Sequence, residues 1–235
     1  MAKTINPFDL HDAPPFAGFP EDALKFFRQL KKNNTREWFA ENKERFESSV
    51  KEPMESLLST LAEGVRSIDP AIVIDPKKSL YRIYRDTRFS KDKTPYKLWI
   101  AASFTHAGKN KTNDPGFYFH VSADEVGIGG GLYMPMPDQL RRLRAVLDTR
   151  ARELRAILAE KTFRARFGEL QGETLSRVPQ GYDKEHPDAD LLKMKQFFCW
   201  ASLDAKSACS PDLPDLLLKH IAAMHPLVRW LLAHA

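Results

Sequence analysis

Apolar residues recur at helical spacing along the first third of the chain. Pro20, whose ring suits a first helical turn, opens a predicted short helix. The apolar stripe of this helix consists of Leu24, Phe27 and Leu30. Asn34, with Glu37 three residues later, is predicted to cap the next helix. A longer amphipathic helix follows, and we expect a kink or restart near Pro53 because the proline ring clashes with the preceding turn. Its apolar series is Phe39, Phe46, Val50, Met54, Leu57, Leu61 and Val65.

The pattern changes to short β-type runs after Asp69 and Pro70. Four segments rich in aromatic or β-branched residues are separated by turn residues, and an apolar run at 196–202 adds a further strand. The four segments are 80–85, 97–105, 116–122 and 126–133. A helix capped by Asp138 follows the fourth segment, and two apolar helical segments, at about 212–224 and 226–234, close the chain.

This order of elements predicts the α+β class, with an antiparallel β-sheet flanked by N-terminal and C-terminal helices. The 235 residues, of which 43% are hydrophobic, fit one large domain with a substantial core. We expect an irregular lead-in over residues 1–18 and a single α+β domain over 19–235, since no internal repeat or linker separates the segments.

Several protein classes are not indicated by the sequence. The two cysteines, Cys199 and Cys209, form neither a disulfide framework nor a zinc motif, which favours a reducing cytoplasm. The first residues contain prolines and acids where a signal peptide needs an apolar run. No stretch approaches the roughly 20 apolar residues of a membrane span, so no membrane partner is expected. The oligomeric state does not follow from the sequence.

Positive charge is concentrated in one short segment. Residues 77–97 contain eight Lys or Arg and two Asp, a net charge of +6, whereas the whole chain carries +5. A local excess of this size makes a potential that attracts anions. The segment therefore predicts a site for a phosphate-bearing or other anionic ligand, with an anionic small molecule and nucleic acid as the two candidate partners.

Arginine and tyrosine give this segment its chemistry. Arginine grips phosphate or carboxylate with two hydrogen bonds, and the rings of Tyr84, Phe89 and Tyr96 are suited to stacking on a base or sugar. We predict a basic, aromatic-lined cleft with the ligand-binding residues Arg82, Arg85, Arg88, Lys91, Lys93, Tyr96, Lys97 and Tyr118. A structural alternative stays open, in which Asp86 and Asp92 pair with the cations and the segment is an internal ion-pair network of a structural or interaction module.

An enzyme is the other alternative. His120 and Tyr118 share one face of a predicted strand, and His120, Asp86 or Asp92 would be the catalytic base or a ligand of a divalent ion in a hydrolase or nuclease. No metal site is predicted elsewhere, because His186, Asp188 and Asp190 are explained by a helix cap. The glycines of 127–131 fail the dinucleotide fingerprint and more often mark a bulge or close backbone approach, so they do not indicate a nucleotide, and the cofactor stays unknown.

The motif RIYRDTRFSKDKTPYK at 82–97 lies within a longer set of matching segments. Together with WFAENKERF before it and GIGGGLYMP and PQGYDKEHPDADLLKMK after it, the chain resembles the conserved-hypothetical family called domain of unknown function 2461. The resemblance covers about 19–203. It implies a bacterial-type intracellular protein of mixed α and β structure, and it brings no established substrate or catalytic residue.

Overall fold

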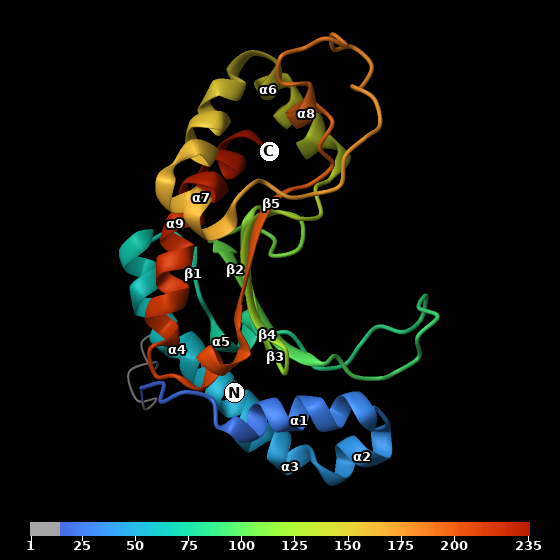
Figure 1. Ribbon diagram of the computed structural model, residues 1–235, viewed down its shortest axis with the longest axis vertical. Coiled ribbons are helices and arrows are strands. Elements are labelled where there is room, and N and C mark those ends of the chain that lie inside the picture. The colour runs from blue at the N-terminus through green and yellow to red at the C-terminus, as the bar shows by residue number, and fades with distance from the viewer. Residues whose placement is uncertain (1–14) are drawn as a thin grey trace, which may run out of the picture. The chain divides into compact units, whose positions relative to one another are not determined.

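The computed structural model describes residues 15–235, so most of the predicted irregular lead-in, residues 1–14, lies outside the described residues. The strands are β1 (Ile72–Val73), β2 (Trp99–His106), β3 (Gly116–Ser122), β4 (Glu125–Leu132) and β5 (Phe197–Asp204). The helices are α1 (Glu21–Lys32), α2 (Arg36–Glu41), α3 (Lys43–Phe46), α4 (Glu52–Ile68), α5 (Pro76–Ser79), α6 (Pro137–Ala159), α7 (Lys161–Phe167), α8 (Ala189–Leu192) and α9 (Leu213–His234) (Figure 1).

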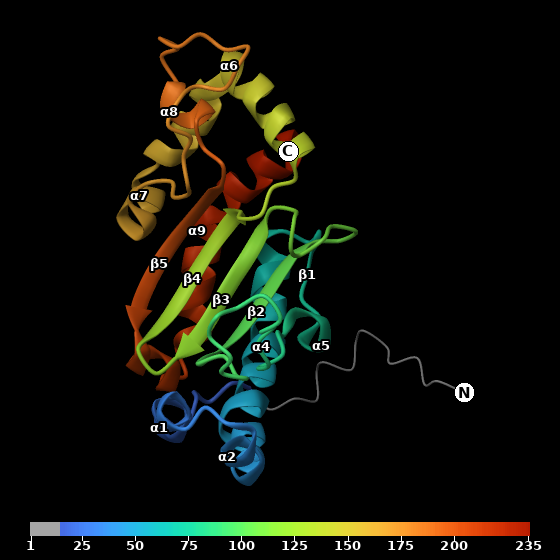
Figure 2. The same ribbon diagram turned by 90° about the vertical axis from the view of Figure 1, so that its right-hand side faces the viewer.

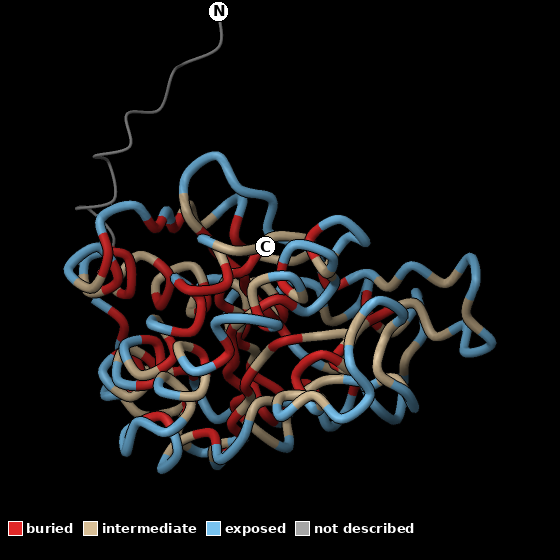
Figure 3. The backbone as a smooth tube through the Cα atoms, turned by 90° about the horizontal axis from the view of Figure 1, so that it is seen from above, coloured by how far each residue is buried: buried red, intermediate tan, exposed pale blue. Residues whose placement is uncertain are grey.

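The five strands form one antiparallel sheet in the order β1-β2-β3-β4-β5 (Figure 2). With helices before and after it in the chain, the sheet makes this an α+β protein, as predicted. Strand β3 has the predicted bounds, and β2, β4 and β5 differ from their predicted bounds by at most two residues at either end. Most residues of β2, β3 and β4 are buried, and the backbone is coloured by burial in Figure 3.

The contacts within the chain divide it into two compact units. The first unit comprises the described residues up to Ala102, together with His120–Val126 and Asp204–Leu216. The second unit comprises Ser103–Phe119, Gly127–Leu203 and Leu217–Ala235. The expectation of one domain over 19–235 stays a prediction.

In the first unit, the predicted long helix is broken into α2, α3, a π-helical turn (Glu47–Lys51) and α4. Pro53 occupies the first turn of α4, where its missing N–H needs no partner, so the predicted restart is confirmed. The predicted cap at Asn34 is wrong. Thr35 caps α2 instead, because its Oγ1 accepts a hydrogen bond from the Trp38 N–H at 3.3 Å.

The predicted strand at 80–85 is also wrong as a regular strand. Only isolated bridges form there, from Leu80 to Ala102 and from Tyr84 to Tyr96. Single backbone hydrogen bonds accompany the bridges, from the Tyr81 N–H to the Ala101 carbonyl at 2.9 Å and from the Lys97 N–H to the Ile83 carbonyl at 2.8 Å, but they do not make a regular ladder.

In the second unit, α9 packs on β4 at a glycine. A Cβ atom built on Gly130 would lie 2.5 Å from the Met224 Sδ and 3.4 Å from the Val228 Cγ2, so the absence of a side chain lets the helix approach the strand. The sequence predicted two helical segments here, but α9 is continuous through Pro226. Burial of Leu217, Ile221, Met224, Val228 and Leu231 along one side of the helix offsets the loss of one backbone hydrogen bond at the proline.

The helix predicted to be capped by Asp138 begins one residue earlier, at Pro137, with Met136 at the N-cap position. Asp138 lies in its first turn, where a carboxylate interacts favourably with the positive end of the helix dipole. Among residues 15–235, no helix is both long and apolar enough to cross a bilayer.

Candidate functional site

Residues 82–97, which we call the basic arm, extend away from the helices and strands of the first unit (Figures 1 and 3). Two backbone hydrogen bonds close the base of the arm, from the Arg85 N–H to the Pro95 carbonyl at 2.9 Å and from the Lys97 N–H to the Ile83 carbonyl at 2.8 Å. The bridge between Tyr84 and Tyr96 lies between them. The basic arm is therefore a hairpin-like excursion with a long loop at its far end.

Helix α2 and Asn34, two residues before the helix begins, hold the base of the arm through Tyr96. The Asn34 side chain accepts a hydrogen bond from the Tyr96 N–H at 3.1 Å and donates one to the Tyr96 carbonyl at 3.0 Å. The Phe39 ring stacks on the Tyr96 ring with centroids 4.1 Å apart. The Tyr96 side chain is only 4% exposed, and this burial raises the pKa of its hydroxyl. Tyr96, predicted as a ligand contact, thus anchors the arm.

Two of the arginines are paired inside the arm. Arg85 bonds the Asp92 carboxylate and the Thr94 hydroxyl. Arg88 makes a two-bond contact with Asp86, at 3.0 Å from Nε and 2.8 Å from a terminal nitrogen. These two contacts fit the predicted ion-pair network.

The same contacts lower the pKa values of the two aspartates in the arm. The Arg88 side chain, aided by the Arg88 backbone N–H, lowers the pKa of Asp86 to about 2. The Thr94 backbone N–H, together with the Arg85 side chain, lowers the pKa of Asp92 to about 2. Both carboxylates are therefore fully ionised at neutral pH and are bound to arginine, which leaves neither suited to act as a base.

The lysines and Arg82 of the arm differ in their contacts. The Lys93 ammonium donates to the Thr87 carbonyl and the Lys97 ammonium to the Arg82 carbonyl, each at 2.9 Å, and both of these acceptors are neutral. Arg82 and Lys91 are exposed, and neither forms a hydrogen bond or ion pair from its side chain within the part of the chain that the structure describes. Six cations against two acids leave the basic arm with a net charge of +4.

An aromatic side chain lies among these charges. Phe89 is 95% exposed, and its ring lies 5.7 Å from the Arg88 guanidinium carbon. Tyr84, nearer the base, is 53% exposed. Burying or stacking a ring is favourable, so an almost fully exposed phenylalanine between cations is a candidate contact residue. The sequence indicated three rings for stacking, and the structure leaves Phe89 and Tyr84 open.

Tyr118 and His120 lie on the same face of β3, with Phe119 between them in the sequence, and they belong to different units. In the second unit, the Tyr118 ring packs beside the Trp200 ring with centroids 5.9 Å apart. In the first unit, the His120 Nε2 lies 3.2 Å from a Glu125 carboxylate oxygen, and the Trp99 ring is 6.0 Å from the imidazole. Burial lowers the pKa of His120, while Glu125 acts in the opposite direction. Sequence reasoning missed Glu125, although its place just after the β3–β4 turn was the available signal.

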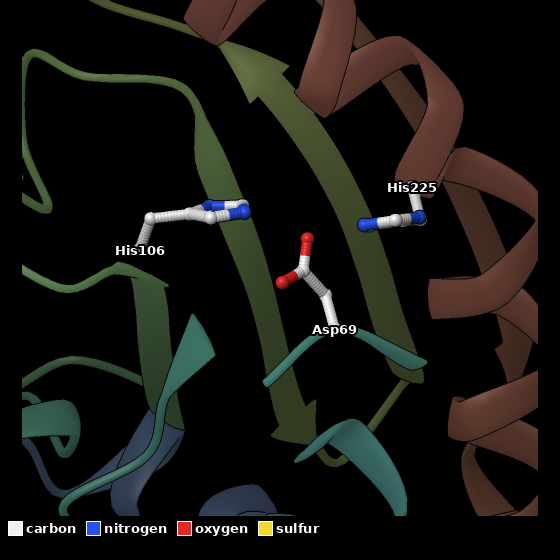
Figure 4. Close-up of side chains that lie close together, drawn as sticks. All are labelled: Asp69, His106 and His225. Atoms are coloured by element: carbon white, nitrogen blue, oxygen red, sulfur yellow. The ribbon is translucent and has the colours of Figure 1, made fainter. Parts of the chain in front are cut away.

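A pair of histidines in the second unit was not predicted either. His106, at the end of β2, and His225, in α9, bring ring nitrogens within 4.8 Å of one another (Figure 4). Asp69, also drawn there, belongs to the first unit, where its carboxylate accepts the Ala71 N–H at 2.9 Å. Two imidazoles supply fewer ligands than transition-metal sites in proteins usually have. Their separation along the chain gives no spacing motif from which to find them.

The fold and the basic arm define a class, an α+β protein with an antiparallel sheet and a positively charged hairpin-like projection. Comparison with protein families places the chain more narrowly. The model of the conserved hypothetical protein family DUF2461 matches residues 22–230, and the chain belongs to this family. The match continues past residue 203, where the resemblance drawn from the sequence ended, and it includes the basic arm and most of α9. A search of curated proteins found no match.

Proposed function

We propose that this protein binds single-stranded nucleic acid, a phosphate-bearing polyanion, through the basic arm. The observation that carries the proposal is the net charge of +4 that remains on the arm after its internal ion pairs are counted, with the exposed Phe89 ring among the charges. Proteins that bind single strands combine cations that contact the phosphates with aromatic rings on which bases stack.

The form of the arm favours a polymer over a small anion. Small molecules bind in concave sites that bury most of their surface, whereas the arm projects from its unit (Figure 1). A strand of nucleic acid needs no enclosure, because several weak phosphate contacts along one side add up. Arg85 and Arg88, already held by Asp92 and Asp86, keep the arm in shape, and Arg82, Lys91 and Lys93 provide charge.

Fluorescence anisotropy with a labelled oligothymidylate of about 20 nucleotides tests the proposal. Affinity should fall with salt on a log–log plot, by about 0.7 for each phosphate contacted, giving a slope of about −2 to −3. Lys91→Gln should reduce the magnitude of this slope by about 0.7. Phe89→Ala should weaken binding by about 1–3 kcal/mol with little change in slope.

Lys184→Gln is the matched control, because Lys184 is an exposed lysine of the second unit. Absence of binding at low salt, or equal behaviour of all three variants, would contradict the proposal. Complete competition by inorganic phosphate at millimolar concentration would assign the arm to a small anion instead. The exposure of Phe89 and Lys91 means that neither change should alter stability by more than about 0.5 kcal/mol, which thermal unfolding checks.

A second candidate function is hydrolysis with His120 as general base. The observation in its favour is the contact between His120 and Glu125 beside Trp99, since a carboxylate that orients an imidazole is a recurring arrangement in catalysis. A panel of nuclease and phosphatase substrates with added divalent ions tests it. Turnover that His120→Gln abolishes supports an enzyme, and turnover that persists in this variant, or none at all, removes the candidate.

A further inference from the structure

A cavity of about 420 Å³ lies in the second unit, at the point where α6 and α7 end. It is bounded by the last residues of α6, by α7, by the segment 168–174 and by the end of α8, all within the second unit. None of its lining residues belongs to the basic arm, so the cavity is independent of the proposed nucleic-acid binding.

Part of the cavity lining is apolar. Leu191 and Met194, which are 3% and 6% exposed, line the cavity together with Leu158 of α6. These side chains offer a surface on which an apolar group of a ligand is removed from water. The volume is within the range of small-molecule sites, at its lower end.

Acidic groups and helix ends also line the cavity. Glu169 and Asp190 line the cavity, as do Ala159, the last residue of α6, and Gly168, the residue that ends α7. The final carbonyls of a helix carry partial negative charge because they lack intrahelical partners. Because Asp190 is paired with Arg155, a cationic group in the cavity meets the Glu169 carboxylate together with the helix ends.

The two arginines of the cavity are in different states. Arg155 is held by two carboxylates, at 2.9 Å from Asp188 and 2.6 Å from Asp190, and its charge is thereby neutralised. Arg164 on α7 is exposed, and no carboxylate pairs with its side chain within residues 15–235. Arg164 is thus the group in the cavity that is free to bind an anion.

We propose that this cavity binds a small zwitterion with an apolar body, the chemistry of an amino acid or a dipeptide. Glu169 and the ends of α6 and α7 face the ammonium group, and Arg164 binds the carboxylate. The apolar side chain packs on Leu191 and Met194. A simple anion leaves Glu169 unused, and a simple cation leaves Arg164 unused.

Titration calorimetry with three probes tests the assignment: leucyl-leucine, which carries both charges, N-acetyl-leucine, which carries only the negative charge, and leucine methyl ester, which carries only the positive one. We expect leucyl-leucine to bind at least about tenfold more tightly than either of the others. Arg164→Gln should abolish that advantage over the methyl ester, and Glu169→Gln should abolish the advantage over N-acetyl-leucine.

Lys161→Gln serves as the control, because Lys161 is an exposed residue of α7 that does not line the cavity. It should leave all three affinities unchanged. Equal affinity for the three probes, no binding of any of them at about 10 mM, or an effect of Lys161→Gln as large as that of Arg164→Gln each overturns the proposal. Circular dichroism of each variant confirms that a lost affinity is not lost folding.

Discussion

The side-chain amide of Asn34 is bonded at both ends to the main chain of Tyr96, 62 residues further along the sequence. The amide takes the place that the backbone of a neighbouring strand would occupy, since it supplies one donor and one acceptor to the same residue. This contact fixes the base of the basic arm to the start of α2.

Asn34→Ala should therefore lower the free energy of unfolding by about 1–3 kcal/mol, because the N–H and carbonyl of the buried Tyr96 lose their partners. Urea denaturation measures the loss. Asn33→Ala is the matched control, since Asn33 is exposed and its side chain donates only to the Gln29 carbonyl at 3.0 Å. We expect a cost below about 0.5 kcal/mol there, and equal costs would show that the Tyr96 contact adds nothing.

The acids of the arm predict a distinct response to acid. The pKa values of Asp86 and Asp92, both about 2, lie below the ordinary value of 3.8. Their contribution to stability is thus present above about pH 4 and is lost as the pH falls through about 2, because only the ionised carboxylates bind arginine. NMR titration of the two carboxyl carbons should give midpoints near pH 2.

Arg88→Ala should raise the pKa of Asp86 towards its ordinary value and leave that of Asp92 unchanged, since Asp92 is bonded to Thr94 and Arg85. A midpoint for Asp86 that does not move in this variant would show that Arg88 does not pair with it in solution.

The two thiols should differ in reactivity. Burial raises the pKa of Cys199 to about 12, and its Sγ lies 3.6 Å from the Gly130 carbonyl. Partial burial raises the pKa of Cys209 as well, by less. Because the thiolate is the reactive form, native protein at pH 8 should react with Ellman's reagent slowly at Cys209 and not at Cys199. Cys209→Ser should then give no signal until urea is added, and a signal before urea would mean that Cys199 is accessible.

Alanine substitutions at two glycines distinguish the cost of backbone strain from the cost of a steric clash. Gly168 has a φ of +69°, and a Cβ built there meets nothing within 4 Å. Gly131 has a φ of +130°, and its Cβ would lie 2.2 Å from the Phe197 carbonyl oxygen. Gly168→Ala should cost about 1–3 kcal/mol from strain alone, and Gly131→Ala about 3–5 kcal/mol because β4 and β5 must also move apart. Thermal unfolding of the two variants measures both losses of stability, and equal losses would contradict the clash at Gly131.

The periodicity of the sequence was sufficient to predict the sheet and most helices. Strands β3, β4 and β5, for example, appear in the sequence as short apolar runs between turn residues. It was insufficient where a distant contact overrides a local signal. Asn34 has the local signature of a helix cap, but it pairs with Tyr96 and leaves the cap to Thr35. Pro226 reads as a helix boundary, but the buried stripe of α9 carries the helix through it.

The local charge composition of the sequence indicated the candidate site better than the spacing of its apolar residues did. The concentration of cations at 77–97 was plain in the sequence, and so were the acids that pair with two of them. The sequence did not indicate which cations pair, because Arg85 reaches Asp92 across the loop whereas Arg88 reaches Asp86 two residues before it. It also gave no reason to expect the cavity beside α7, whose walls come from segments that meet only after folding.

The side chains that maintain the shape of the basic arm are different from those that it presents to solvent. Arg85, Asp92 and Thr94 bond to one another, and Asn34 and Phe39 hold Tyr96. Within residues 15–235, the side chains of Lys91 and Phe89 form no hydrogen bond or ion pair. Exchanging the outward residues should therefore redirect recognition without unfolding the support beneath them. The arm is for this reason a suitable place to graft a new specificity onto an unchanged scaffold.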